Sequence, residues 1–285
     1  MDQSPPQQKT IVTHISPDLD AIASSWLIKK YLPEWKEAEM MYVAASTTLG
    51  NNPPDADENI IHVDTGGGRF DHHQTVARLS ATKLVFEFLK EKGHIARRDL
   101  AAVSRIVEQV NEIDNFAEAT WPDPNSDIYD FGLHQLIFGI KGVESNPTVY
   151  VPHIMTMLDG LIIIMKNKIA AEEELQNGFV FNTKWGKAIA FETRNEETLR
   201  LALKSHYALA LRHDPHSGFT KVKAFPVETI DLTPVYEAVK KADTRATWHL
   251  VGSNHILLDG STANPSAQKT HLAFSAIIEI IKKIS

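Results

Sequence analysis

The sequence contains no cysteine, which excludes disulfide bonds and metal sites built on thiolates. A metal would therefore be held by carboxylate oxygens and imidazole nitrogens, and the lack of cysteine is compatible with the reducing cytoplasm, where we expect the protein to act. An excess of basic residues is also missing, because 36 Asp and Glu outnumber 29 Lys and Arg. Since proteins that coat long nucleic acid present a basic face, we expect no long duplex DNA as a partner.

A long hydrophobic run is missing as well. The most apolar stretch, residues 158–165, is interrupted by Asp159 and ends at Lys166, well short of the roughly 20 residues that cross a bilayer. We therefore expect no membrane partner. The first nine residues are polar and rich in Pro and Gln, so we expect a disordered lead-in over 1–9 rather than a signal peptide.

The pattern that is present, from residue 10 onward, is an alternation of strands and helices. Such alternation is typical of a parallel sheet flanked by helices, which places the chain in the α/β class. The predicted strands cover 11–14, 38–45 and 58–63, and the predicted helices cover 21–31, 81–91, 97–117, 131–140 and 148–177.

The pattern changes at Asn177-Gly178, where the last of these helices, a long connector, is predicted to end. Further strands are predicted over 179–181, 188–191, 207–211, 220–225 and 248–258, and further helices over 233–241 and 272–283. We therefore divide the chain into the lead-in 1–9, a catalytic domain 10–177 and a smaller α/β domain 178–285 that would bind substrate.

Two short segments carry the chemistry, and each follows an apolar strand. Residues 14–20 (His-Ile-Ser-Pro-Asp-Leu-Asp) follow the strand at 11–13, and residues 64–73 (Asp-Thr-Gly-Gly-Gly-Arg-Phe-Asp-His-His) follow the strand at 60–63. In an open parallel sheet, residues just past the carboxyl ends of neighbouring strands converge on one crevice. Imidazoles and carboxylates gathered there suit a pair of divalent cations, so the pattern predicts a dinuclear metal site and hydrolysis at phosphorus.

Simpler structural explanations exist for single parts of this pattern. Asp18 could cap a helix that begins near Ala21. The glycines at 66–68 lack the Gly-Lys-Ser/Thr ending of a phosphate-binding P-loop. Two adjacent imidazoles after an acidic residue have little packing purpose in an exposed loop, however, and all three features occur in order at strand ends. The combination therefore favours a metal site.

These motifs resemble the signature of the DHH phosphoesterase superfamily. That signature comprises His-x-x-Pro-Asp-x-Asp-Ala, here residues 14–21, then Asp64, then Asp-His-His at 71–73, and a later acidic motif, here 110–115. The second, third and fourth motifs are most similar to the melanocyte-proliferating-gene branch of manganese-dependent RNA exonucleases. That branch normally has a Phe-His-x-Asp-type first motif, whereas residues 17–20 follow the wider superfamily.

The resemblance implies a site with two metal ions. His14 and Asp18 would hold one ion and Asp20 the other, and Asp64 would bridge both. His72 would complete the ligand set of the second ion, and Asp114 would contribute from a helix. Manganese is the expected metal, with magnesium as the alternative. A water shared by two such ions has a lowered pKa, and the resulting hydroxide would attack a phosphoester.

Roles for the loop around these ligands follow from the same resemblance. His73 would contact the scissile phosphate or protonate the leaving group, and Asp71 would orient His72 by accepting a hydrogen bond. Gly67 and Gly68 would let the backbone approach the substrate, and Arg69 would contact its phosphate.

The second domain offers two polar pairs as substrate contacts. Superfamily members bind the distal end of the substrate with a glycine-rich turn that carries a histidine. Residues 252–255 occupy a comparable place without the glycine run. Arg212 with His213, and Asn254 with His255, could bind a nucleotide phosphate or base, or they could be polar residues at turns and strand ends.

Three functions remain open from the sequence. The leading one is a manganese-dependent phosphodiesterase or exonuclease that acts on short RNA or nucleotides. The second is a pyrophosphatase-like enzyme or a nucleotide phosphatase, for which the expected Arg-Lys-Lys-like cluster near the C-terminus is missing. The third is a non-catalytic metal or nucleotide sensor. The presence of every expected ligand argues against this third function. Monomer and homodimer both stay open.

Overall fold

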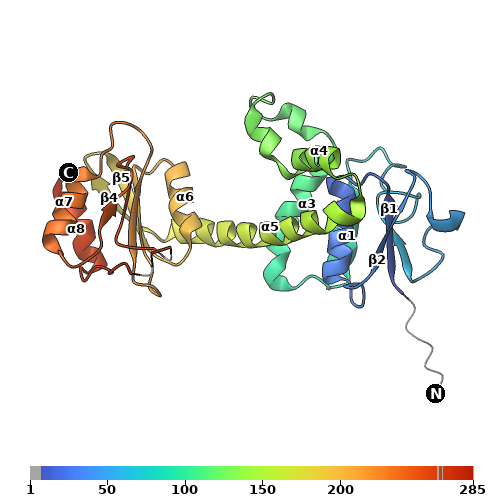
Figure 1. Ribbon diagram of the computed structural model, residues 1–285, viewed down its shortest axis with the longest axis horizontal. Helices are drawn as coiled ribbons and strands as arrows, with labels where there is room; N and C mark the ends of the chain where they lie inside the picture. The colour runs from blue at the N-terminus through green and yellow to red at the C-terminus, as the bar shows by residue number, and fades with distance from the viewer. Residues whose placement is uncertain (1–7, 262, 265, 285) are drawn as a thin grey trace, which may run out of the picture. The chain divides into compact units, whose positions relative to one another are not determined.

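A computed structural model describes residues 8–261, 263–264 and 266–284, and it divides the chain into two compact units, Met1–Lys166 and Asn167–Ser285 (Figure 1). The chain is an α/β protein with one small parallel sheet and one mixed sheet, as the sequence predicted at the level of class. Seven of the nine residues of the predicted disordered lead-in lie outside the described residues. The sequence analysis placed the domain boundary at 177/178, just after a long helix that ends at Gln176. The structure divides the chain within that helix, at 166/167.

The sheet of the first unit has three parallel strands, with β1 (Thr10–His14) between β2 (Glu39–Val43) and β3 (Ile60–His62). Ile11 and Val12 of β1 are fully buried. The register pairs His14 with Val43 and Val12 with His62, so the three strands end at the same edge. Residues that follow β1 and β3 are therefore delivered to one place.

Helix α1 (Leu19–Tyr31) packs on this sheet, and two further helices that pack on α1 bring more residues to the same edge. These helices are α2 (Ala81–Glu91) and α3 (Arg97–Asp114), and residues 19–28 of α1 are all buried. The sequence predicted α2 with these bounds, and α3 three residues longer than it is. Because α3 ends at Asp114, that carboxylate stands at a helix terminus, as expected.

The chain after α3 forms short helices before the next long one. They are the 3-10 turns η2 (Ala117–Thr120) and η3 (Asp127–Phe131), followed by α4 (Leu133–Val143). Several large apolar side chains of this segment are exposed, among them Phe116, Ile128, Phe131 and Phe138.

Helix α5 (Pro147–Gln176) runs from the first unit into the second. It is long and apolar enough to cross a membrane, with a mean hydropathy of 1.6 over 18 residues, of which 28% are buried. Core helices of soluble proteins can reach the same length and hydropathy. Asp159 accepts hydrogen bonds from Trp26 Nε1 at 3.0 Å and Lys30 Nζ at 2.7 Å, which tie this part of the helix to α1.

The second unit contains a six-stranded mixed sheet of order β4-β5-β6-β7-β9-β8. Its strands are β4 (Phe179–Thr183), β5 (Gly186–Glu192), β6 (Leu209–His213), β7 (Thr220–Ala224), β8 (His249–Leu250) and β9 (Ile256–Leu258). Helices α7 (Thr233–Ala242) and α8 (Phe274–Ile284) pack on one face, and α6 (Glu196–Lys204) packs on the other. Alternate residues of β5 contribute to the two cores, Ala188 to the first and Ile189 to the second.

Two details of this unit differ from the sequence-based prediction. The single strand predicted over 248–258 is two strands joined by a turn in which Asn254 has a φ of 57°. Helix α6 was not predicted at all. It is required because β5 and β6 are parallel, and a parallel pair needs a crossover connection. The Asn195 side chain caps it by accepting from the Glu197 N–H at 3.1 Å.

Candidate metal centre

Two candidate ligands come from the turn between β1 and α1. His14 is the last residue of β1, and Asp18 is the N-cap of α1, where its Oδ1 accepts from the Ala21 N–H at 3.1 Å. The capping explanation for Asp18 is therefore correct. The metal explanation is compatible with it, because ligand atoms of His14, Asp18 and Asp64 all lie within 4.8 Å of one another.

Asp20 lies in the first turn of α1 and is almost fully buried, with 2% exposed. Its two carboxylate oxygens accept from the Ala81 N–H at 2.7 Å and the Thr82 N–H at 2.8 Å, at the start of α2. Burial raises the pKa of Asp20 to about 8, and the carboxylates of Asp64 and Asp114 add to this effect. The backbone of α2 thus fixes a carboxylate that is costly to ionise without a nearby cation.

Asp64 occupies the centre of the group. It follows β3 with a φ of 55°, a left-handed conformation that Asp tolerates better than most residues, and its N–H donates to Phe70 O at 3.0 Å. This turn aims Oδ2 at His14 Nε2 and Oδ1 at His72 Nε2, each at 3.3 Å. Burial acts to raise the pKa of Asp64, but the two imidazoles outweigh it and hold the pKa below its usual value. Asp64 therefore lies between two sets of ligands, as a bridging carboxylate must.

His72 faces three carboxylates. Its Nε2 atom lies 3.3 Å from Asp64 Oδ1, 3.5 Å from Asp114 Oδ2 and 3.7 Å from Asp20 Oδ2. Asp64 is the main cause that raises the pKa of His72 to about 9, and burial opposes it. Burial raises the pKa of Asp114 to about 6, although the neighbouring His72 lowers it.

Three of these facing atoms have no hydrogen-bond partner within the part of the chain that the structure describes. They are Asp64 Oδ1, His72 Nε2 and Asp114 Oδ2, and all three are buried. Buried polar atoms are almost always hydrogen-bonded, so a cluster of unpaired ones needs an explanation. A cation at this place would supply the missing partner for all three. The donor set therefore fits a metal.

The six predicted metal ligands fall into overlapping groups whose ligand atoms lie within 4.8 Å of one another. The groups are His14, Asp18 and Asp64; Asp20, His72 and Asp114; and Asp64, His72 and His73. Asp64 is shared by the first and third groups, and His72 is shared by the second and third. The structure thus brings together all six residues that the sequence predicted, in an arrangement that could hold a metal ion.

His73, a member of the third group, also pairs with Asp71, which belongs to none of the groups. His73 Nδ1 lies 2.7 Å from Asp71 Oδ1, and 61% of the His73 side chain is exposed. The prediction that Asp71 orients His72 is wrong. The Asp71 carboxylate instead contacts His73, two residues later in the chain, which is a local bonding pattern common for Asp. The His72 ring points toward the carboxylates of Asp20, Asp64 and Asp114.

The glycine turn and Arg69 are occupied by contacts within the protein. The Gly67 N–H donates to Asp71 Oδ2 at 2.7 Å, and a side chain on Gly68 would lie 2.9 Å from Asp55 Oδ2. Arg69 Nε lies 3.7 Å from Asp55 Oδ1, and its guanidinium lies 4.6 Å from the centre of the Phe70 ring. These contacts explain the glycines and Arg69 by local packing rather than by substrate binding.

The predicted substrate residues of the second unit do not form one site. Arg212 Nη1 donates to Arg194 O at 3.0 Å, and His213 Nδ1 lies 3.1 Å from Thr220 Oγ1. His255 Nε2 lies 2.9 Å from Val227 O, and Asn254 forms the turn between β8 and β9. His213 pairs with the first residue of β7, whereas His255 O accepts from the last. The two pairs thus lie at opposite ends of one strand, with structural partners of their own.

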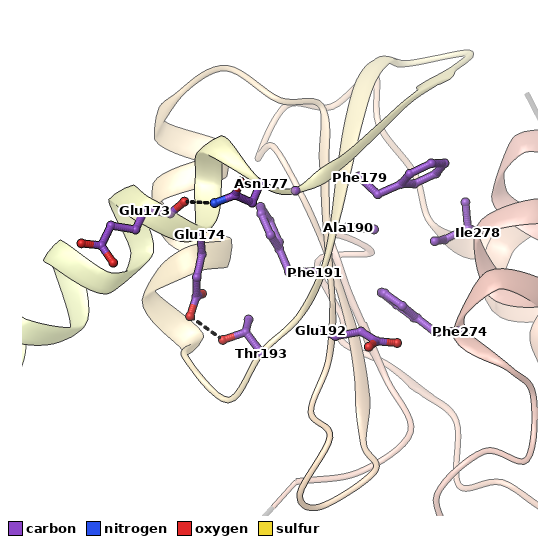
Figure 2. A pocket seen from close by; sticks show the side chains of 11 residues that line it. Glu173, Glu174, Asn177, Phe179, Ala190, Phe191, Glu192, Thr193, Phe274 and Ile278 are labelled. Atoms are coloured by element: carbon purple, nitrogen blue, oxygen red, sulfur yellow. Dashed lines mark hydrogen bonds between the residues drawn. The ribbon is translucent and has the colours of Figure 1, made fainter.

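A cavity of about 540 Å³ in the second unit is shown in Figure 2. Its walls combine Glu173, Glu174 and Glu192 with Phe179, Phe191 and Phe274. Glu174 accepts a hydrogen bond from Thr193 Oγ1 at 2.9 Å. Carboxylates without a basic side chain repel an anion, so this cavity does not suit a phosphate group.

A smaller cavity, of about 320 Å³, adjoins the metal group in the first unit. It shares three carboxylates with that group and is otherwise lined mainly by α3 and the segment that follows it. The lining includes Asp18, Asp20, Asp114, Phe116, Glu118, His134 and Phe138. The sequence analysis missed the last four residues, although Phe116 comes directly after the acidic motif at 110–115.

Comparison with known protein families settles the ancestry of the first unit. Residues 11–165, more than half of the chain, match the family model described as ChrB, C-terminal domain. The chain belongs to this family. The assignment to the DHH phosphoesterases and their melanocyte-proliferating-gene branch is therefore wrong. Short Asp and His motifs after strand ends reflect what a metal requires, and unrelated families can share them.

Other comparisons add little. The chain is similar to a solved structure titled "Crystal structure of an uncharacterized protein from Helicobacter pylori G27", at 14% identity over 98% of this chain and 99% of that one. The TM-score is 0.26, which does not establish a common fold. None of the curated proteins matches the chain.

Proposed function

We propose that the protein is a metal-dependent phosphoesterase, a phosphodiesterase or exonuclease that acts on nucleotides or short RNA. The observation that carries this proposal is the cluster of unpaired buried atoms Asp64 Oδ1, His72 Nε2 and Asp114 Oδ2. A purely structural cluster would pair its imidazole and carboxylates by hydrogen bonds, since unpaired buried groups are costly.

The residues divide between two ions as the geometry groups them. His14 and Asp18 would hold one ion, Asp20, His72 and Asp114 would hold the other, and Asp64 would contact both. Oxygen and imidazole ligands in this mixture suit manganese, with magnesium as the alternative. Two such ions, when bound, neutralise charge on phosphoryl oxygens and lower the pKa of water.

His73 supports catalysis rather than simple metal storage or sensing. Its ring is mostly exposed, its centre lies 4.5 Å from that of the His72 ring, and Asp71 fixes it through Nδ1. This bond leaves Nε2 as the nitrogen that could give a proton to a leaving group. The carboxylate of Asp71 would stabilise the protonated ring between transfers.

The substrate class follows from charge. The net charge of −7 disfavours a long polyanion and favours a small substrate that the ions themselves attract. Short RNA and nucleotides meet this requirement, and we expect them in the cytoplasm.

A turnover screen tests the proposal. The full chain, stripped with a chelator and then supplied with manganese, should hydrolyse short oligoribonucleotides, cyclic dinucleotides or phosphoadenosine phosphate, and the stripped protein should not. Asp64→Asn should abolish this activity, while Asp123→Asn, in an exposed loop of the same unit, should not. Pyrophosphate as the best substrate would favour a pyrophosphatase, and metal binding without turnover of any substrate would favour a sensor.

A further inference from the structure

The cavity beside the metal group has a composition that the ions alone do not explain. Three of its wall residues are the metal-group carboxylates Asp18, Asp20 and Asp114. A phosphoryl group bound at the ions would therefore have the rest of its molecule directed at this cavity. Its volume of about 320 Å³ lies at the lower end of the range of roughly 300–1,000 Å³ typical of small-molecule sites.

Two aromatic rings line the cavity and remain exposed. Phe116 is 69% exposed and Phe138 is 64% exposed, although each could have been buried in a core. Phe116 also adopts a φ of 57°, a conformation that a residue of its size rarely takes. Strain of this kind persists where surrounding structure enforces it, and it is concentrated at functional sites.

Helix α4 is tied to the metal-binding turn, which holds Phe138 beside the ligands. Lys141 Nζ donates to Ser16 O at 3.0 Å, in the turn between His14 and Asp18. The same Nζ lies 5.6 Å from the centre of the Phe138 ring. One lysine thus contacts both the aromatic wall and the loop that carries a metal ligand.

A polar pair completes the wall. His134 is buried, and its Nε2 lies 3.5 Å from the buried Oε2 of Glu118. The Glu118 side chain as a whole is 22% exposed and lines the cavity. Aromatic faces for stacking, next to a carboxylate that accepts N–H groups, are what a nucleobase requires. A sugar phosphate or pyrophosphate would have no use for the two phenylalanines.

We propose that this cavity binds the base of a nucleotide whose phosphate lies at the metal ions, with the base stacked on Phe116 and Phe138. The inference rests on the proposed phosphoesterase function and specifies its substrate class. It places base recognition in the first unit, on α4 and the segment after α3, rather than in the second unit.

Binding to the full chain, measured calorimetrically with manganese present, tests this inference. The probes are adenosine 5′-monophosphate and ribose 5-phosphate, which differ only by the base. Phe116→Leu and Phe138→Leu should each weaken binding of the adenosine nucleotide by about 5- to 100-fold, as expected for loss of a stacked base. Both variants should leave ribose 5-phosphate binding and the manganese-induced rise in Tm unchanged.

Phe131→Leu is the matched control, because Phe131 is 80% exposed in the same segment and does not line this cavity. It should bind both probes as the unmodified protein does. Equal effects on the two probes, or no effect on either, would overturn the inference. The turnover screen shows whether the protein hydrolyses its substrate, and the calorimetric measurement shows whether the base binds in this cavity. The two proposals can therefore fail independently.

Discussion

The Nε2 atom of His72 lies 3.3 Å from Oδ1 of Asp64, and neither atom makes a hydrogen bond within the described chain. In the protein without metal, this proximity favours the protonated imidazole, and the pKa of His72 is raised to about 9. A metal ligand must instead be deprotonated. Proton release and metal binding are therefore linked at this pair.

The first prediction is that manganese stabilises the protein more as the pH rises from 6 to 8. In the metal-free protein the pKa of His72 is raised to about 9 and that of Asp20 to about 8. The stabilisation linked to these shifts is complete when the pH is below the pKa values of the same groups in the unfolded chain. That stabilisation is lost as the pH rises through the folded values. Because the metal competes with these protons, the manganese-induced increase in Tm should grow with pH. An increase that is constant across this range would contradict the linkage.

The second prediction separates the two adjacent imidazoles. His72→Ala removes a ligand and should lower the bound manganese, measured by mass spectrometry of the purified protein. His73→Ala should retain the metal but lower kcat by roughly 10²–10⁴-fold, as expected for loss of a general acid. His153→Ala, which removes an exposed imidazole from α5, is the control and should change neither. Equal metal loss in the His72 and His73 variants would refute the division.

The third prediction concerns Asp71 as a positioning residue for His73. Asp71→Asn keeps an oxygen that can accept the Gly67 N–H. It removes the charge that holds the ring and replaces the oxygen that accepts from the His73 N–H with an amide N–H₂. We expect kcat to fall by roughly 10- to 100-fold, the usual range for a residue that orients a functional side chain at a metal site. The amount of bound manganese should not change. Adding Asp71→Asn to His73→Ala should cause little further loss, because both residues act through one group. Fully multiplicative losses would show that Asp71 works independently.

The fourth prediction contrasts two buried carboxylates in the metal-free protein. Asp20→Asn would place an amide N–H₂ against a backbone N–H of α2, which leaves a donor unpaired. The free energy of unfolding in urea should fall by about 1–3 kcal/mol. Asp114→Asn removes a buried charge whose Oδ2 has no hydrogen-bond partner in the described chain, so it should be neutral or stabilising. Equal destabilisation by both would contradict the proposed anchoring of Asp20.

The sequence was sufficient to predict much of the first unit. Its class and the bounds of α2 follow from local patterns, and the residues after β1 and β3 meet because parallel strands end at one edge. The full set of six ligands, which includes Asp114 on α3, came from the resemblance. Residues such as His14 and Asp64 could be placed without any long-range information. The family could not be derived in this way, since a few ligand positions weigh little beside the match over residues 11–165.

The errors arose where local bonding or tertiary context decides. Whether Asp71 bonds His72 or His73 depends on turn geometry that residue types do not specify. Helix α6 is short and is required by the parallel pairing of its flanking strands, which becomes evident only from the sheet. The aromatic wall at Phe116 and Phe138 depends on how α4 folds back beside the metal-binding turn.

The most direct test of the central claim is anomalous scattering from crystals of the full chain soaked with manganese. We expect two manganese peaks. One should contact His14 and Asp18, the other Asp20, His72 and Asp114, and both should contact Asp64. The absence of manganese from these residues, or its binding only elsewhere on the chain, would contradict the account.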